Sequence, residues 1–289
     1  MKREEGGDPK CQRSDGKERI ERQNGEHMAE KKKVQAVITS QIQVSEGIYS
    51  MWLKFPQNYN VAAMARPGQF ISLYCSEGSR LLPRPISICE ILAEEAMLRI
   101  VYRVAGEGTR EFSQRTEGDK IEVVGPLGNG FEQREGSALL IGGGIGIPPM
   151  LELAKTLHHK GQDVKVVLGY RDNDLFLASD FEADGQVYFS TEDGSVGTHG
   201  NVIDAIREQN ISADAIYSCG PIPMLRGVKQ YGLEQGIATQ ISMEEKMACG
   251  IGACLACVCQ TKEIDGHSHV HNTRICKDGP VFYAQDIEL

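Results

Sequence analysis

The stretch Met247-Ala-Cys-Gly-Ile-Gly-Ala-Cys-Leu-Ala-Cys-Val-Cys259 organises the C-terminal part of this 289-residue chain. Its cysteines follow the spacing Cys249-x4-Cys254-x2-Cys257, and Cys276 stands eighteen residues further on. This is the ligand spacing of a plant-type [2Fe–2S] cluster, which is held by four thiolates. The spacing therefore predicts a cluster site with these four cysteines as its ligands.

Two glycines inside the stretch favour close wrapping of the backbone around a small inorganic core. Gly250 and Gly252 have no Cβ, so they can adopt positive φ and let backbone N–H groups point at sulfur. The alternative is a structural zinc site, because Cys-x2-Cys is half of many zinc modules. Zinc modules usually contain two short Cys-x2-4-Cys pairs, whereas Cys276 has no cysteine close to it in sequence. The spacing therefore favours an iron–sulfur cluster over zinc.

Composition restricts the class of protein. A hydrophobic content of 40% and a charged content of 25% are typical of a globular chain. The net charge of −9 gives no sign of a nucleic-acid partner. The chain shows neither a signal peptide nor an apolar run of about 18 residues, so no membrane span is expected. Most of the cysteines gather near the C-terminus, a metal-site distribution that fits a reducing cytoplasm.

The chain divides by composition and rhythm. Residues 1–32 are polar and charged and are expected to form a disordered tail, with Met1 and Met28 both open as the start. Residues 33–134 carry six short strand-like runs with Gly and Pro between them, which predicts an antiparallel β-barrel. A short helix is expected at Arg110–Thr116. The six runs are Val34–Val44, Ile48–Phe55, Gln69–Cys75, Ile86–Cys89, Ala96–Val104 and Lys120–Val124.

From residue 135 to residue 242 apolar strands alternate with helices, which predicts a doubly wound parallel α/β domain. Its ligand should lie at the carboxyl ends of the strands. Residues 243–289 are expected to form a cluster subdomain, so the fold class is α+β multidomain. The expected strands are Ala138–Ile141, Val164–Leu168, Val187–Ser190, Ala215–Ser218 and Thr239–Ser242, and the helices are Met150–His159, Val202–Gln209 and Met224–Glu234.

Three barrel motifs could hold phosphate. They are Arg84-Pro-Ile-Ser87, the stretch Tyr102–Thr109 with its glycines, and Gly125-Pro-Leu-Gly-Asn-Gly-Phe131. Small residues with Arg and Thr can cradle a pyrophosphate, and Arg makes paired charge-assisted bonds. Each glycine taken singly could equally be a barrel turn. The candidate phosphate partners are Arg84, Arg103 and Arg110.

Two motifs lie in the parallel domain. Gly142-Gly-Gly-Ile-Gly146 follows a strand and precedes a helix, a context that favours pyrophosphate at the helix N-terminus. It lacks the G-x-G-x-x-G spacing of a Rossmann fingerprint. Cys219-Gly-Pro221 follows another strand, and its plain reading is a buried cysteine before a tight turn.

Taken in order, these motifs resemble the ferredoxin–NADP reductase superfamily. Within it the chain is similar to the electron-transfer subunits of type B, NAD-dependent, dihydroorotate dehydrogenases. The resemblance runs from about Val34 to the C-terminus. It is strongest in Arg84–Ser87, Gly106–Thr109, Gly125–Phe131, Met243–Cys254 and Val270–Pro280.

The resemblance implies FAD on the barrel, with the Ser87 hydroxyl near the flavin N5, and NAD on the parallel domain. Wider members of the superfamily carry a Tyr that stacks on the flavin where this chain has Ile86, so the stacking partner stays open, with Tyr102 as a candidate. The implied FAD residues are Arg84, Pro85, Ile86, Ser87, Val101, Tyr102, Arg103, Gly108 and Thr109. The implied NAD residues are Gly142, Gly143, Gly144, Gly146, Pro148, Cys219, Gly220 and Pro221.

The resemblance also implies an electron path in pyrimidine biosynthesis. An FMN-containing catalytic subunit would oxidise dihydroorotate, and electrons would pass through this chain's cluster and FAD to NAD+, in a heterotetramer of two plus two subunits. Residues 34–289 leave no room for a TIM barrel of about 250 residues, so this chain should not itself bind dihydroorotate. No side chain is expected to act as a catalytic acid or base. The preference for NAD over NADP stays open.

Two other functions stay open at this point. One is a reductase subunit of an NAD(P)H:ferredoxin type in another flavin and iron–sulfur system. The other is a zinc-stabilised binding module. Cys259 is expected to be a packed or surface thiol, and His267, His269 and His271 are expected to lie on a loop and not to bind metal.

Overall fold

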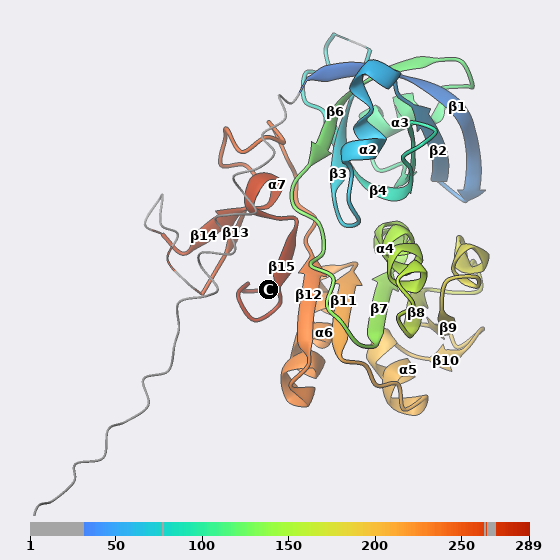
Figure 1. The fold of residues 1–289 in the computed structure, drawn as a ribbon, viewed down its shortest axis with the longest axis vertical. Helices are drawn as coiled ribbons and strands as arrows, with labels where there is room; N and C mark the ends of the chain where they lie inside the picture. Colours follow the sequence, from blue (N-terminus) through green and yellow to red (C-terminus); the bar gives the residue numbers. More distant parts are fainter. Residues whose placement is uncertain (1–31, 77, 263, 265–269) are drawn as a thin grey trace, which may run out of the picture. The chain divides into compact units, whose positions relative to one another are not determined.

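The computed structural model describes residues 32–76, 78–262, 264 and 270–289, and its first large element is a closed six-stranded barrel (Figure 1). The predicted antiparallel barrel is confirmed, with neighbours in the order β1-β2-β5-β4-β3-β6. The predicted disorder of residues 1–32 lies, except for Lys32, outside the described residues. The strands are β1 Lys33–Ser45, β2 Ile48–Lys54, β3 Phe70–Tyr74, β4 Arg84–Leu92, β5 Met97–Arg103 and β6 Lys120–Leu127.

Alternation of side chains explains why this sheet closes. On β3, Ile71 and Leu73 are buried in the barrel core, while Phe70 and Tyr74 belong to a different apolar cluster outside it. Short helices cover the barrel, and Val61 and Phe112 from them are buried in its core. These helices are η1 Gln57–Tyr59, α2 Val61–Met64 and α3 Glu107–Ser113. The helix α3 starts and ends three residues earlier than the range expected from sequence.

The second sheet has seven strands in the order β10-β9-β8-β7-β11-β12-β15, where β15 is Val281–Tyr283. Every pair is parallel except β12 with β15, so the predicted doubly wound domain is confirmed. The apolar run Ala138–Ile141 is continuous because β7 lies between β8 and β11 and is buried on both faces. The strands are β7 Ala138–Gly143, β8 Val164–Tyr170, β9 Gln186–Thr191, β10 Thr198–His199, β11 Ala215–Cys219 and β12 Ala238–Ser242.

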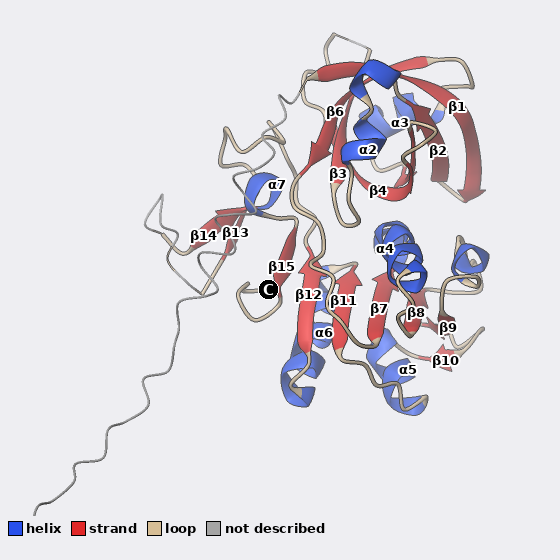
Figure 2. Cartoon of the chain, in the orientation of Figure 1, coloured by secondary structure: helices blue, strands red, loops and turns tan. Residues whose placement is uncertain are grey.

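Helices cover both faces of this sheet (Figure 2). Ala138 and Leu140 of β7 pack in one cluster with the buried side of α4. Leu139 and Ile141 pack in another cluster with α5 and α6. The helices are η2 Gly144–Gly146, α4 Pro148–His159, η3 Ala178–Phe181, α5 Val202–Glu208 and α6 Ile222–Gln235.

The C-terminal segment adds one strand to the parallel sheet instead of standing apart from it. β15 pairs antiparallel with β12, with Ile241 opposite Phe282. The rest of the segment forms a small two-stranded sheet and a short helix. None of the described helices is long and apolar enough to cross a membrane. The segment's elements are β13 Val258–Gln260, β14 Asn272–Arg274, α7 Ile275–Asp278 and β15 Val281–Tyr283.

Candidate functional site

Four thiols gather in the C-terminal segment as two neighbouring pairs. The Sγ atoms of Cys249 and Cys254 lie 3.3 Å apart. In the second pair, the backbone N–H of Cys276 donates to Cys257 Sγ at 3.4 Å. Within the described ranges no group of three or more His, Cys, Asp or Glu side chains is arranged around one metal ion. Two pairs of thiols suit a cluster of two irons, each taking two thiolates.

The loop between Cys249 and Cys254 aims backbone N–H groups at sulfur. Cys254 N donates to Cys249 Sγ at 3.4 Å, and Gly252 N donates to Cys276 Sγ at 3.2 Å. Gly250 and Gly252 reach this shape with φ of +67° and +82°, which L side chains rarely adopt. The residues therefore fit an anionic sulfur-ligated group, which such a concave set of donors stabilises.

The acidity of the thiols follows from the same contacts. Burial opposes ionisation of Cys249, but backbone N–H groups at Ile251, Ala253 and Cys254 outweigh it and lower its pKa to about 6. Burial and the neighbouring Cys257 thiol raise the pKa of Cys276 to about 12. Of these two thiols, Cys249 therefore ionises more easily than Cys276.

The other candidate ligands of this segment lie outside the pairs. Cys259 is on β13, and burial raises its pKa to about 11. The Nδ1 of His271 lies 3.0 Å from the Lys262 carbonyl oxygen. His267 and His269 lie outside the described residues. Cys259 is thus a half-buried thiol on β13, and His271 lies before β14 (Asn272–Arg274).

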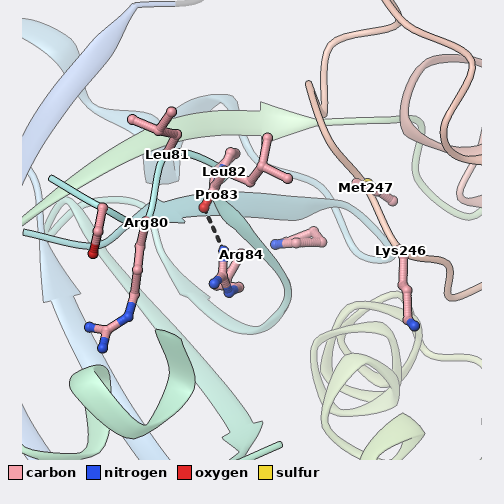
Figure 3. A pocket seen from close by; sticks show the side chains of 9 residues that line it. Arg80, Leu81, Leu82, Pro83, Arg84, Lys246 and Met247 are labelled. Atoms are coloured by element: carbon pink, nitrogen blue, oxygen red, sulfur yellow. Dashed lines mark hydrogen bonds between the residues drawn. The ribbon is translucent and has the colours of Figure 1, made fainter. Parts of the chain in front are cut away.

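A cavity of about 500 Å³ opens between the barrel and the residues just before the cluster loop. Figure 3 shows Arg80–Arg84 of the barrel on one side and Lys246 with Met247 on the other. Its size is within the usual range of ligand sites, about 300–1,000 Å³. Arg84 lines it and donates through Nη1 to the Leu82 carbonyl at 2.5 Å. Sequence reasoning missed Lys246 and Met247, although their place ahead of Cys249 could have indicated them.

Gly108 shapes the same region. A Cβ added there would stand 2.5 Å from Arg84 Nε and 2.8 Å from its Cζ. The absence of a side chain at Gly108 therefore leaves the guanidinium its position. Arg84 and Pro85 line the cavity together, which is where the resemblance placed a flavin.

The suggestion that Tyr102 stacks on the flavin is corrected by the position of its side chain. Its side chain is 1% exposed inside the barrel, with its ring 6.0 Å from Tyr49 and its hydroxyl donating to Gln41 Oε1 at 3.0 Å. Ile86 also packs on the barrel core. Val101 points out of the barrel and packs with α4. The alternation of β5 decides this, since neighbouring residues must face opposite sides.

The remaining predicted phosphate partners have other contacts. Thr109 Oγ1 accepts from the N–H groups of Ala105 and Gly106 and caps α3. Arg110 is 62% exposed at its side chain and lies 3.5 Å from Glu107. Arg103 is exposed at the end of β5. None of these three side chains lines the cavity.

The motif Gly125–Phe131, which could have held phosphate, contacts the cluster segment. Asn129 N donates to the Gly279 carbonyl at 2.6 Å, and Asn129 Nδ2 donates to the Val281 carbonyl at 2.9 Å. Val281 N returns a bond to Asn129 Oδ1 at 3.0 Å. A Cβ on Gly128 would stand 2.5 Å from Pro280 Cδ. The motif thus fastens the chain that follows Cys276 to the barrel.

The two glycine loops of the parallel domain meet at its topological switch point. The chain leaves β7 toward β8 on one side and returns to β11 on the other. In such sheets the ligand lies at the carboxyl ends of the strands where the order reverses. The loops touch there, because a Cβ on Gly146 would stand 2.4 Å from the Cys219 carbonyl carbon. The predicted residues Gly142–Gly146 and Cys219–Pro221 are thus brought together.

Cys219 itself is fully buried, and burial strongly raises the pKa of its thiol. Met224 closes the other side of the same site, because a Cβ on Gly143 would stand 2.4 Å from its Sδ. The site therefore offers close-fitting backbone, the helix start at Pro148 and an uncharged thiol. These are features of a dinucleotide site, in which backbone must approach the ligand closely.

A barrel beside a doubly wound sheet, with a cysteine-rich end, defines a class of two-domain reductases carrying an iron–sulfur segment. Family models match the parallel-sheet domain and the cysteine-rich end of the chain. Residues 140–230 match the oxidoreductase NAD-binding domain, and residues 244–288 match the iron–sulfur cluster binding domain of dihydroorotate dehydrogenase B. The chain is an oxidoreductase subunit with an iron–sulfur segment, and the zinc alternative is not supported.

Similar proteins define the class more narrowly. One relative, the electron transfer subunit of dihydroorotate dehydrogenase B (NAD(+)) from Fusobacterium nucleatum, is 42% identical over 262 residues, 87% of this chain and 97% of the relative. The subunit of the same name from Bacillus pumilus is 43% identical over 264 residues, 89% of this chain and 99% of the relative. The chain belongs to the family of dihydroorotate dehydrogenase B electron transfer subunits.

Solved structures share the fold. An NADH-dependent reduced ferredoxin-NADP oxidoreductase matches with a TM-score of 0.78 and 30% identity, over 88% of this chain and 89% of that one. A ferredoxin NADP+ reductase from Neisseria gonorrhoeae, solved with bound FAD and NADP, matches in fold with a TM-score of 0.60 and 17% identity, over 75% and 95% of the two chains. The predicted superfamily, fold class and electron-transfer role are confirmed.

Proposed function

We propose that this chain passes electrons from a partner flavoprotein through a [2Fe–2S] cluster and FAD to NAD+, in the dihydroorotate dehydrogenase reaction of pyrimidine biosynthesis. One observation carries the proposal. The cavity bounded by Arg84 and Pro85 on the barrel is bounded opposite by Lys246 and Met247, just before the ligand Cys249. A flavin held there would lie next to the cluster. When bound, a flavin exchanges hydride with NAD and single electrons with a cluster.

The chain's own residues bind and orient these groups. Arg84 offers a charged donor to a phosphate or ring oxygen. Ser87 on β4 pairs with Phe70 on β3, so both side chains face the outside of the barrel. Gly108 leaves room for the Arg84 guanidinium. The loops Gly142–Pro148 and Cys219–Pro221 would hold the NAD pyrophosphate and nicotinamide. The cluster ligands would be Cys249, Cys254, Cys257 and Cys276.

The partner is proposed to be an FMN-containing catalytic subunit that oxidises dihydroorotate, in a complex of two plus two chains. Apolar side chains are exposed around the cluster loop, where such a subunit would dock. Ile251 is 50% exposed, Leu255 68% and Val258 37%. Ile264 and Val270, on the following loop, are also exposed. Exposed apolar patches of this kind mark protein interfaces, and an obligate interface is the more apolar type.

Two further features belong to the same proposal. We propose functional divisions at residues 33–134, 135–242 and 243–289, which the family matches at 140–230 and 244–288 support. A cytoplasmic location fits the free thiols of the described cysteines, because reducing compartments preserve them.

A second candidate is a reductase subunit that works with ferredoxin. The 30% identity to an NADH-dependent reduced ferredoxin-NADP oxidoreductase favours it. Identities of 42–43% to the dihydroorotate dehydrogenase B subunits favour the first proposal.

Reconstitution separates the two functions. The isolated chain, loaded with FAD and cluster, should reduce ferricyanide with NADH and should not oxidise dihydroorotate. Adding the FMN-containing subunit should create dihydroorotate-dependent NAD+ reduction, which the Cys276→Ser variant should lack. Dihydroorotate oxidation by the isolated chain would overturn the division of labour. Full activity of the complex with Cys276→Ser would overturn the route through the cluster.

A further inference from the structure

A buried hydroxyl lies among apolar side chains where the barrel contacts the cluster segment. Phe70, Ser72 and Tyr74 alternate along the outer face of β3. Phe70 packs in one apolar cluster with the ligands Cys257 and Cys276, and Tyr74 packs against that cluster. Ser72 stands between them and is 2% exposed. The cluster segment therefore covers the face of β3 that carries this hydroxyl.

The Ser72 hydroxyl points at the ligand loop. A Cβ added to Gly250 would stand 3.0 Å from Ser72 Oγ, and 3.9 Å from Leu127 Cδ1. Gly250 directly follows Cys249 and has a φ of +67°. Two separate properties thus require glycine at this position, the backbone conformation and the approach of the hydroxyl.

The same hydroxyl has no hydrogen-bond partner within the described part of the chain. A buried hydroxyl without a partner costs free energy, and native proteins rarely leave one unsatisfied. Its surroundings on the barrel side are apolar, because Val124 is its partner on β6 and packs in the same cluster as Phe70. The open direction is toward the loop that presents Cys249.

Ser72 also adjoins the flavin motif. In the register of β3 and β4, Ser72 stands opposite Pro85, and Phe70 stands opposite Ser87. Paired residues of adjacent strands face the same side of a sheet. Ser72 therefore shares its face with Pro85, which lines the cavity proposed for FAD, while its hydroxyl approaches Gly250 of the ligand loop.

We propose that Ser72 is a positioning residue whose hydroxyl donates a hydrogen bond to a sulfur at the cluster, and thereby raises the cluster's reduction potential. This inference rests on the proposed function, because it requires a cluster at the four cysteines. Hydrogen bonds to the sulfurs are among the factors that set the potential of iron–sulfur clusters. The direction follows from charge, since reduction adds an electron and a donor stabilises the more negative state.

Potentiometric titration of the holoprotein, monitored by EPR, tests the inference. Ser72→Ala should keep its iron and shift the cluster midpoint to a more negative value. The expected change is about tenfold in the reduction equilibrium, or about 59 mV for a one-electron couple. Ser72→Thr, which keeps the hydroxyl, should stay within half of that shift from wild type. The potential of the bound flavin should not change in either variant.

Ser190→Ala is the matched control, because Ser190 on β9 is also buried, at 1% exposure, and also lacks a partner among the described residues. Its cluster midpoint should equal that of wild type. A Ser72→Ala midpoint equal to wild type would overturn the inference, and so would a shift in the flavin potential alone. Loss of iron from Ser72→Ala would also overturn it, because the hydroxyl would then be needed to hold the cluster and not to set its potential. A wild-type protein that binds no iron would overturn the proposed function itself, and iron content measured first distinguishes the two failures.

Discussion

Two contacts of the barrel with other described parts of the chain differ in their chemistry. The contact with α4, which starts at the proposed NAD loop, combines apolar packing of Cys89 and Val101 with buried charged side chains, and is called here the charged contact. The contact with the cluster segment combines apolar packing with uncharged hydrogen bonds from Asn129, and is called the apolar contact. Ile91 N on β4 donates to the Glu152 carboxylate on α4 at 2.7 Å, whereas Phe70 and Leu127 of the barrel pack with Cys257.

The charged contact is a network across the four elements β4, β5, η3 and α4. Arg99 on β5 lies 3.1 Å from Glu90 and 2.5 Å from Asp180, and Lys155 on α4 lies 2.5 Å from the same Glu90. The side chains of Arg99 and Glu90 are only 13% and 12% exposed. Buried ion pairs add little net stability compared with apolar packing, yet removing one partner is costly. The network therefore fixes orientation more than it adds stability.

The difference matches the proposed transfers. Hydride transfer between NAD and flavin requires reacting atoms about 3–3.5 Å apart, and directional bonds between β4 and α4 can hold such a geometry. Electron transfer involving the cluster needs no bond formation, and an apolar contact keeps water away from sulfur and limits solvent exposure, a factor in cluster potential. Disturbing each contact separately should thus affect different measurements.

The largest effect should come from the four cysteines proposed as cluster ligands. Cys249→Ser, Cys254→Ser, Cys257→Ser and Cys276→Ser should each lose the cluster, because each removes one thiolate from a two-iron site. Iron analysis and the visible spectrum measure this. Cys259→Ser is the control, since its thiol lies on β13 outside the two pairs. Loss of iron from Cys259→Ser together with full iron in Cys276→Ser would show that the ligand set is wrong.

The flavin cavity should give the next largest effect. Arg84→Ala removes a charged donor from the cavity wall, and a hydrogen bond to a charged group contributes roughly 1.5–3 kcal/mol. FAD should therefore bind roughly ten- to a hundredfold more weakly, measured by flavin retained after gel filtration and by titration. Arg207→Ala on α5 is the control, because its exposed guanidinium pairs with Glu234 at 3.7 Å. Unchanged retention in Arg84→Ala would move the FAD site away from this cavity.

The Asn129 side chain tests how the cluster segment is fastened to the barrel. Asn129→Ala leaves Val281 N and the Val281 carbonyl without their side-chain partner, which should lower the free energy of unfolding by about 1–2 kcal/mol. Iron should also be lost faster on dilution, because the bonded stretch begins at Asp278, just after Cys276. Urea unfolding and timed iron release measure the two effects.

Gln230→Ala is the control for this variant, since that amide bonds Glu234 on the same helix. If Asn129→Ala matches wild type in both measurements, the apolar packing alone fastens the segment.

Local patterns explain what could be predicted from sequence. The barrel strands alternate, and Ala138–Ile141 is buried on both sides, so both sheets could be recognised. The ligand spacing around Cys249 is itself local. Which side of the sheet a single residue faces is not determined by local sequence. Tyr102 lies in the barrel core because of the register between β2 and β5, where it pairs with Tyr49.

Contacts between distant segments were the part that could not be predicted. Asn129 and Val281 are 152 positions apart, and the motif around Asn129 has the composition of an ordinary turn. β15 has only three residues, too few to show a period, and its place beside β12 depends on the whole C-terminal segment. Nothing in sequence marks Glu152 either, because its importance depends on the approach of β4.

The smallest expected effect, when taken over a single pH unit, is a pH dependence at the charged contact between β4 and α4. Burial raises the pKa of the Glu152 carboxyl from 4.5 to about 7, although the Ile91 N–H and Lys155 oppose the shift and Glu90 adds to it. Between pH 4.5 and 7 the folded chain then holds a proton that the unfolded chain lacks, so stability should fall as pH rises through this window. The slope from this group is at most about 1.4 kcal/mol per pH unit.

Glu152→Gln cannot ionise and still offers an oxygen to Ile91 N, so it should match wild type near pH 5 and be the more stable protein at pH 8. Urea unfolding at pH 5, 6, 7 and 8 measures the difference, with Glu208→Gln on the exposed end of α5 as control. Parallel curves for wild type and Glu152→Gln would mean that the carboxyl is ionised throughout, and that the charged contact responds to pH no more than the apolar one.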